Sequence, residues 1–309
     1  MTPSAVRTAL GALLWALSLS AVAASDDLEM LAPGVYWHRG VHQEASAANR
    51  GDIANKGVVV GTRCAAVIDT GGSLADGQAL IAAVRQVTTV PVCYVINTHM
   101  HPDHVFGNAA FETLDPRPEF IGHPNLPAAL AQRASTYLNR LDALLGDAAA
   151  GTRVVGPDRV VDGQLELDLG GRTLVLQSWP TAHTNNDLTV FDRASGVLWL
   201  SDLLFRERIP ALDGSLTGWL AVSAQLRDLP ARIGVPGHGP AGTDWRAALA
   251  AQDAYLNRVA ATVRQALSEG RSLAQTVAAA DPADAAGWQL ADDYHVRNLT
   301  AAFAELEWE

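Results

Sequence analysis

The chain has 309 residues, of which 49% are hydrophobic and 18% are charged, and its formal net charge is -11. A chain of this length and composition buries a substantial core, which excludes an intrinsically disordered protein. The acidic balance excludes the basic surface that nucleic-acid binding normally requires, so we predict no nucleic-acid partner.

Residues 1–24 have the pattern of a secretory leader. One cation, Arg7, precedes an apolar stretch at residues 9–19, and Ala21-Val22-Ala23 places small residues at a cleavage site. The stretch is shorter than the roughly 20 residues of a membrane-spanning helix. We therefore predict a cleaved signal peptide, a periplasmic or secreted mature chain over residues 25–309, and no stable membrane insertion after cleavage.

The mature chain begins with strand-like segments at residues 35–38, 56–60 and 65–69. A helix capped by Ser73 follows, and residues 91–97 form the next buried strand. This β-α-β order predicts that the strands at 65–69 and 91–97 are parallel neighbours.

Two cysteines, Cys64 and Cys93, lie at the start of these two strands. In an exported protein they can form a disulfide if the strands are adjacent. The alternative, which we favour from the sequence, is two buried thiols that pack as small hydrophobic groups. The sequence leaves both explanations open.

The remaining segments predict helices on both sides of a group of strands, in which apolar and polar residues alternate. Residues 105–112 look helical, residues 124–147 form a helix interrupted at Pro127, and two further helices are expected at 216–229 and from 244 onward. Between them lie strands with hairpin turns at residues 164–169, 172–179, 188–192 and 197–201, and a short strand at 233–235.

Antiparallel hairpins after a parallel unit favour an α/β fold with four layers, an α/β/β/α sandwich, over one doubly wound sheet. No linker rich in proline or serine divides the mature chain. We predict one domain over residues 25–309, with a core at about 50–240 and a helical C-terminal extension at 243–309.

Four metal-ligating side chains crowd the segment Thr98-His99-Met100-His101-Pro102-Asp103-His104. Alternate residues at a strand end share a face, so His99 and His101 point to one side. The turn into the next helix directs Asp103 and His104 to a second point. Imidazole and carboxylate groups at this density predict a metal site, with zinc the first choice.

Three later residues, His183, Asp202 and His238, each follow a strand-like segment. A lone histidine at a strand end is more often a hydrogen-bonded structural residue than a ligand. The dense first cluster favours the ligand interpretation for all three. Gly237 and Gly239 beside His238 permit a close approach of the backbone.

The order of these motifs, HxHxDH, then a histidine, an aspartate and Gly-His-Gly, resembles the metallo-β-lactamase superfamily from about Asn55 to Pro240. The resemblance implies two Zn²⁺ ions per chain. The first would be held by His99, His101 and His183. The second would be held by Asp103, His104 and His238. Asp202 would bridge the two ions.

The same resemblance implies that Asp69 orients the ligands. From the chemistry of a metal-bound water, we expect Asp103 to be the catalytic residue that orients or deprotonates the nucleophile. A carboxylate at Asp202 resembles the glyoxalase II and lactonase branches rather than dedicated β-lactamases. His101 argues against the flavo-diiron proteins, which have glutamate there.

Further segments resemble the quinoprotein relay system zinc metallohydrolases, exported proteins associated with dehydrogenases that use pyrroloquinoline quinone. They are residues 47–51, 92–97, 212–216, 218–220 and 305–309. This resemblance implies a periplasmic quinoprotein dehydrogenase as a partner.

The resulting hypothesis is an exported binuclear zinc hydrolase that uses a metal-bound hydroxide against a small-molecule ester, thioester, lactone or β-lactam. One alternative is a mononuclear iron enzyme like the persulfide dioxygenases, and another is a non-catalytic partner of a quinoprotein. Arg206, Arg208 and Trp219 are candidates for substrate contact. The interpretation that we favour from the sequence is two solvated or paired arginines and a core tryptophan.

Overall fold

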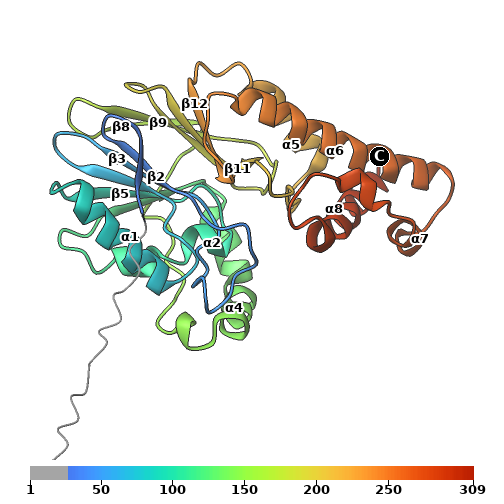
Figure 1. The fold of residues 1–309 in the computed structure, drawn as a ribbon, viewed down its shortest axis with the longest axis horizontal. Coiled ribbons are helices and arrows are strands. Elements are labelled where there is room, and N and C mark those ends of the chain that lie inside the picture. The colour runs from blue at the N-terminus through green and yellow to red at the C-terminus, as the bar shows by residue number, and fades with distance from the viewer. Residues whose placement is uncertain (1–26) are drawn as a thin grey trace, which may run out of the picture.

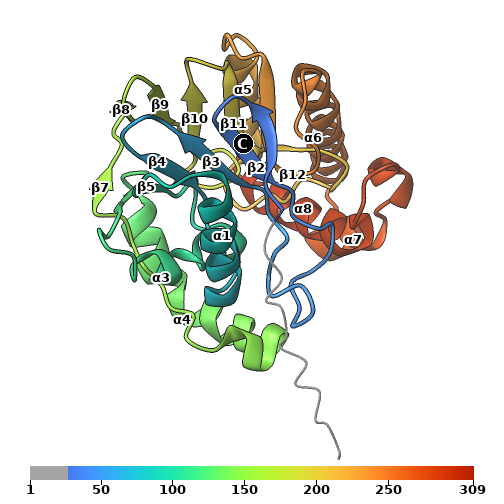
Figure 2. The same cartoon turned by 60° about the vertical axis from the view of Figure 1, so that its left-hand side comes forward.

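The computed structural model describes residues 27–309, so the predicted signal peptide lies outside the described residues. Two β-sheets face each other, and helices cover the outer face of each (Figure 1, Figure 2). The fold is the four-layer α/β/β/α sandwich predicted from the sequence, with helices at its C-terminal end.

The first sheet has seven strands in sequential order. Strands β1 to β4 are antiparallel, and β4 to β7 are parallel. The predicted parallel pairing of β4 with β5 is confirmed. The strands are β1 (Glu29–Ala32), β2 (Val35–His38), β3 (Lys56–Val60), β4 (Ala65–Ile68), β5 (Val92–Ile96), β6 (Glu119–Gly122) and β7 (Arg159–Val160).

The second sheet has five strands in the order β12-β11-β10-β9-β8. The hairpins from β8 to β11 are antiparallel as predicted, whereas β11 and β12 are parallel. The strands are β8 (Gln164–Asp168), β9 (Thr173–Ser178), β10 (Leu188–Asp192), β11 (Val197–Phe205) and β12 (Ile233–His238).

Helices of the first half begin where the sequence provides a cap or a proline. The Ser73 hydroxyl accepts a hydrogen bond from the Asp76 amide at 3.1 Å and so starts α1 (Leu74–Val87). Pro127 does not interrupt α4 (Leu126–Leu145), as the sequence had suggested, because it lies in the first turn, where no amide donor is needed.

Two short helices, α2 (Pro102–Val105) and α3 (Asn108–Phe111), replace the single helix expected at residues 105–112. Gly107 lies between them, and a Cβ there would be 2.0 Å from the Thr70 carbonyl oxygen. A glycine therefore allows this segment, which carries the histidine cluster, to pack closely against the loop that follows β4.

The second half adds α5 (Leu216–Leu226), α6 (Trp245–Ser268), α7 (Leu273–Ala278) and α8 (Ala291–Leu306), with 3-10 turns at Gly146–Ala149 and Pro282–Ala285. Figure 1 shows α6, α7 and α8 extending beyond the sheets at the C-terminal end. No helix of the described residues is long and apolar enough to cross a membrane.

Three of the four apolar cores among the described residues correspond to the spaces between layers. Trp37 and Trp199 belong to the core between the sheets, and Leu80 and Phe120 to the core between the first sheet and its helices. The third core joins β11 to α5, α6 and α8. The C-terminal helices therefore share a core with the second sheet.

Cys64 and Cys93 form a disulfide, with their Cα atoms 5.7 Å apart. The parallel pairing of β4 and β5 brings these two positions together. Of the two explanations that the sequence left open, the disulfide is the one that the structure shows.

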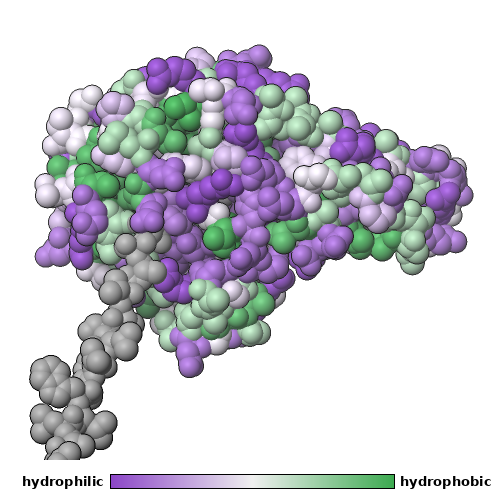
Figure 3. Space-filling model, in the orientation of Figure 1, coloured by the Kyte–Doolittle hydropathy of each residue, from purple (hydrophilic) through white to green (hydrophobic). Residues whose placement is uncertain are grey.

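On the face drawn in Figure 3, hydrophobic residues form small groups separated by hydrophilic ones.

Candidate metal centre

Seven histidine and aspartate side chains meet at one end of the sandwich, and both sheets contribute. The first sheet supplies four from the segment that follows β5: His99, His101, Asp103 and His104. The second sheet supplies three, from the β9–β10 loop, β11 and β12: His183, Asp202 and His238. The structure thus brings together all seven residues that the sequence singled out.

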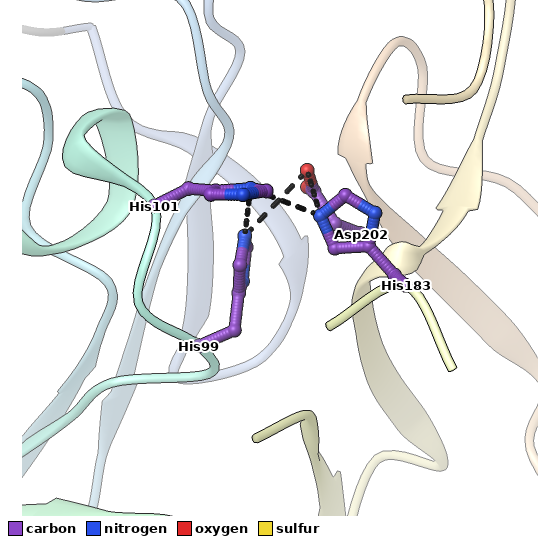
Figure 4. A group of neighbouring side chains, drawn as sticks. All are labelled: His99, His101, His183 and Asp202. Atoms are coloured by element: carbon purple, nitrogen blue, oxygen red, sulfur yellow. Dashed lines mark hydrogen bonds and ion pairs between the residues drawn. The ribbon is translucent and has the colours of Figure 1, made fainter. Parts of the chain in front are cut away.

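The first group consists of His99, His101, His183 and Asp202, whose ligand atoms lie within 4.8 Å of one another (Figure 4). Nδ1 of His101 is 3.1 Å from Nε2 of His99 and 3.0 Å from Nε2 of His183. Oδ2 of Asp202 is 3.7 Å from Nε2 of His99 and 3.3 Å from Nε2 of His183. The nitrogens and the oxygen converge on one point.

The second group consists of Asp103, His104 and His238. Oδ2 of Asp103 is 3.7 Å from Nε2 of His104 and 3.4 Å from Nε2 of His238. Asp202 also faces this group, because its Oδ1 is 3.1 Å from His104 Nε2 and its Oδ2 is 3.5 Å from His238 Nε2. Asp202 lies between the two groups, as a bridging carboxylate must.

The other ring nitrogen of each histidine contacts a hydrogen-bond acceptor. His104 Nδ1 donates to Oδ2 of Asp69 at 2.8 Å. The other four contacts join His99 to the Thr98 hydroxyl (3.1 Å), His101 to Asp213 (2.9 Å), His183 to the Ala211 carbonyl (2.6 Å) and His238 to the Ile53 carbonyl (2.7 Å). Such contacts fix the tautomer and leave the converging nitrogen free to bind an ion.

Burial opposes the charged form of the histidines of the first group that lie deepest. Burial lowers the pKa of His99 well below its ordinary value, and it lowers the pKa of His183 to about 3. Burial also opposes the charged form of His104, but the carboxylates of Asp202 and Asp69 raise its pKa well above the ordinary value.

Local backbone geometry places Asp202 inside β11 rather than after its end, as the sequence had suggested. Ser201 has a φ of 46°, and the register with β12 shifts on both sides of it. A Cβ on Gly237 would lie 1.7 Å from Oδ1 of Asp202. The glycine before His238 therefore makes room for the carboxylate between the two groups.

The donor set fits a pair of divalent ions. Nε2 of His104 and Oδ1 of Asp202 are buried and make no hydrogen bond among the described residues, although they lie 3.1 Å apart. A buried polar atom without a partner costs about 1–3 kcal/mol, and a cation between the two atoms would satisfy both. Imidazole nitrogens with carboxylate oxygens suit zinc.

A sequence model of the Metallo-beta-lactamase superfamily matches residues 49–238, more than half of the chain. The chain belongs to this superfamily. The match includes all seven residues of the two groups and ends at His238. No relative among curated proteins matches the sequence.

Solved structures share the fold of this chain. A metallo-β-lactamase from Pontibacter korlensis is 19% identical, with a TM-score of 0.59, over 75% of this chain and 99% of its own. The stereoselective inverting sec-alkylsulfatase Pisa1 from Pseudomonas sp. is 15% identical, with a TM-score of 0.67, over 91% of this chain but 50% of its own. At these identities the likeness concerns the fold alone.

In this member of the superfamily, the two groups of donor side chains border a cavity of about 350 Å³. Four of the seven side chains line it: His101, Asp103, Asp202 and His238. Its walls come from α4, α8 and the loops that precede β3 and follow β11. The cavity gives a small molecule access to both groups.

Of the three residues proposed to contact substrate, the structure brings Arg208 alone to this cavity. Arg206 donates instead to the Asp244 carboxylate at 2.7 Å and to the Pro240 carbonyl at 2.9 Å, outside the cavity lining. Trp219 is fully buried in the core beneath α5. We therefore withdraw Arg206 and Trp219 as candidates for substrate contact.

Sequence reasoning missed Asp213 and the residue that holds it. Oδ2 of Asp213 accepts from His101, and Arg133 of α4 donates to both carboxylate oxygens at 2.7 and 3.0 Å. Burial raises the pKa of Asp213, but the His101 and Arg133 contacts outweigh it and lower the pKa to about 2. No spacing signal connects these residues, because Asp213 lies 112 positions from His101.

Proposed function

We propose that this chain is a binuclear zinc-dependent hydrolase that acts on an ester, thioester, lactone or β-lactam carbonyl. The observation that carries the proposal is the pair of donor groups that share Asp202 and open into one cavity. Membership of a superfamily composed mostly of hydrolases supports the same conclusion.

The residues of the site divide the work. Two bound divalent ions supply a water of lowered pKa and a Lewis acid that polarises the carbonyl. Asp103 lines the cavity, and although burial raises its pKa, the neighbouring His104 and His238 lower it below the ordinary value. The Asp103 carboxylate is therefore available at neutral pH to orient the nucleophile or accept its proton.

We also propose that the mature protein is periplasmic or secreted and associates with a periplasmic quinoprotein dehydrogenase. The leader-like residues 1–24 support export. The Cys64–Cys93 disulfide fits an oxidising compartment. The quinoprotein association rests on sequence resemblance, and co-purification from a periplasmic extract tests it.

Metal stoichiometry of the wild type and of Asp202→Ala tests the proposed function. We expect about two zinc ions per chain in the wild type and about one in the variant, because the shared carboxylate is lost. Asp168→Ala is the matched control, since this aspartate is exposed on β8 and pairs with Arg63. Full retention of both ions in Asp202→Ala would contradict the bridging role.

A hydrolysis panel of esters, thioesters, lactones and β-lactams completes the test. Turnover that disappears in both Asp202→Ala and Asp103→Asn would support the hydrolase. Iron in place of zinc in the purified protein would favour a redox enzyme like the persulfide dioxygenases. A zinc-loaded protein without activity on any member would favour a non-catalytic partner of a quinoprotein.

A further inference from the structure

Two histidines that enter the first group from opposite sides are oriented by one loop (Figure 4). His183 donates from Nδ1 to the Ala211 carbonyl at 2.6 Å, and Nε2 of His101 lies 2.9 Å from Oδ2 of Asp213. Both acceptors belong to residues 210–213, which lie between β11 and α5 and which we call the orienting loop. The position of this loop therefore affects where two of the ligands point.

The orienting loop has little backbone support of its own. Among the described residues, no backbone-to-backbone hydrogen bond involves residues 210–212, and Pro210 has no amide hydrogen to donate. The Asp213 amide donates to the His183 carbonyl at 3.2 Å, but this contact only joins the loop to the segment that it orients. Because buried backbone groups need partners, side chains must hold the loop.

Asn298 of α8 supplies these partners. Its Oδ1 accepts from the Leu212 amide at 2.9 Å, and its Nδ2 donates to the Pro210 carbonyl at 2.7 Å. Asn298 is 1% exposed and borders the cavity. The two contacts lie on either side of Ala211 in the sequence, so one side-chain amide holds the loop on both sides of the carbonyl that orients His183.

The partners of Asn298 also fix the orientation of its own amide group. The Leu212 amide can only donate and the Pro210 carbonyl can only accept, which excludes a flipped side chain. Nδ2 donates a second time, to the Tyr255 hydroxyl at 2.9 Å, and this tyrosine of α6 is fully buried. Oxygen and nitrogen of the amide are thus both engaged, and the loop is connected through Asn298 to two helices.

The second group takes its outer contacts from other parts of the chain. His104 is oriented by Asp69 and His238 by the Ile53 carbonyl, and both acceptors precede β5 in the sequence. Among the described residues, the hydrogen bonds of the Asn298 side chain reach only α6 and the orienting loop. Its loss should therefore affect the first group and spare the second.

We propose that Asn298 is a positioning residue for the first metal group, because it holds the orienting loop that directs His101 and His183. The inference rests on the proposed binuclear site and adds a requirement for the C-terminal helix α8. This helix lies beyond residues 49–238, which match the superfamily model. A part of the chain outside the matched region is thus needed for full zinc affinity in the first group.

Zinc affinity, measured by competition with a chromophoric chelator, tests the proposal without turnover. In Asn298→Ala the ion of the first group should bind about tenfold or more weakly, because contacts that orient a ligating histidine typically matter by this amount. The ion of the second group should bind as in the wild type. Asn298→Asp serves if Asn298→Ala fails to fold: it keeps the acceptor for Leu212, loses the donor for Pro210 and should be intermediate.

A double-mutant cycle separates positioning from general destabilisation. Asn298→Ala and Asp213→Ala both act on His101 through the orienting loop, so their effects on zinc affinity should be less than additive in free energy. Asn298→Ala and Asp69→Asn act on different groups and should be additive. Ser223→Ala, which removes a buried hydrogen bond between α5 and α6, is the matched control. Additivity in both cycles, or an equal weakening of both ions in Asn298→Ala, would overturn the proposal.

Imidazole N–H signals of protein labelled with ¹⁵N-histidine provide a spectroscopic readout. In the zinc-loaded Asn298→Ala variant, the Nδ1–H of His183 should exchange faster with water, because its acceptor carbonyl is no longer held. The Nδ1–H of His104, which donates to Asp69, should stay as protected as in the wild type. An unchanged His183 signal, or equal loss of both signals, would count against the positioning role.

Turnover of the ester, thioester, lactone and β-lactam panel separates this inference from the hydrolase function. Hydrolysis by the wild type, together with an unchanged first-group zinc affinity in Asn298→Ala, would sink the positioning role and leave the hydrolase. A zinc affinity that depends on Asn298, in a protein that hydrolyses no member of the panel, would do the reverse.

Discussion

The position of the Asp202 carboxylate depends on the glycine at residue 237. Asp202 faces both groups, and its position depends on the absence of a side chain at residue 237, where a Cβ would lie 1.7 Å from Oδ1. The backbone of β12 cannot retreat easily, because the Asn55 side-chain amide donates to the Pro236 carbonyl at 2.8 Å.

Gly237→Ala should therefore displace the Asp202 carboxylate while leaving every proposed ligand in the sequence. We expect loss of about one zinc ion per chain, because Asp202 is the carboxylate that both groups share. Gly156→Ala is the control, since nothing lies within 4 Å of a Cβ at that glycine. Unchanged zinc content in Gly237→Ala, measured by elemental analysis, would show that the carboxylate moves aside without cost.

Asp213 acts on the first group through His101. It accepts from His101 Nε2 at 2.9 Å, so its loss should free the ring and weaken zinc binding by about 10–100-fold. Competition with a chromophoric chelator measures this affinity in Asp213→Ala. Asp213→Asn keeps one acceptor and should be intermediate, whereas Asp158→Ala, which removes a surface partner of Arg117, should match the wild type.

At the scale of elements, a side chain of the C-terminal helix α8 caps the N-terminus of α5. The Glu305 carboxylate accepts from the backbone amides of Leu216 and Thr217 and from the hydroxyls of Ser215 and Thr217. These are the amide donors that a helix N-terminus leaves without intrahelical partners. One side chain thus fixes the relative position of two helices that cover the second sheet.

Glu305→Gln should lower the free energy of unfolding by about 1 kcal/mol at pH 7, since the carboxylate is part-exposed and screened. Burial raises the pKa of Glu305, but its hydrogen bonds with Thr217, Leu216 and Ser215 outweigh burial and lower it. The stabilisation is therefore fully present above the unfolded pKa of about 4.5 and is lost as the pH falls through the lower pKa of the folded state. Urea unfolding of both proteins at a series of pH values from 7 to 3 measures this, with exposed Glu307→Gln as control; a difference that does not shrink over this range would contradict it.

Sequence patterns were sufficient for the elements that carry strong periodicity or caps. The β4-α1-β5 unit and the hairpins of the second sheet followed from alternation and turn residues. β6 and β7, of four and two residues, were too short to show a pattern. Helical structure was predicted from residue 244 onward, but no local signal showed that Tyr294 and Arg297 would line the cavity.

The candidate site was likewise predictable in part, where a local pattern of residues indicated it. The spacing of His99, His101, Asp103 and His104 indicated a metal on its own, because such crowding is costly without a cation. His183, Asp202 and His238 needed the chain order of a known family. Asp213 could not be found, since its role arises from a contact between distant loops.

At the scale of the whole molecule, the C-terminal helices are part of the domain. Leu299 of α8 is fully buried in the core that also contains Leu203 and Phe205 of β11. The strand that carries Asp202 therefore packs on its outer side against the helices beyond the superfamily match.

Leu299→Ala should destabilise the entire fold by about 3 kcal/mol, because it leaves a cavity in this shared core. We expect one transition, seen together by circular dichroism and by zinc release. Thr300→Ala, exposed on the same helix, should unfold like the wild type. A separate early transition of the C-terminal helices, with the zinc retained, would show that they form an independent unit.

Each donor group draws side chains from both sheets. Ions bound there would be ligands of the closed sandwich and not of either half, so their binding free energy would be added to the association of the two halves. For zinc, each tenfold rise in the free ion above its dissociation constant would add about 1.4 kcal/mol per ion to that association. The contact between the sheets would consequently strengthen or weaken with the zinc concentration of the surroundings.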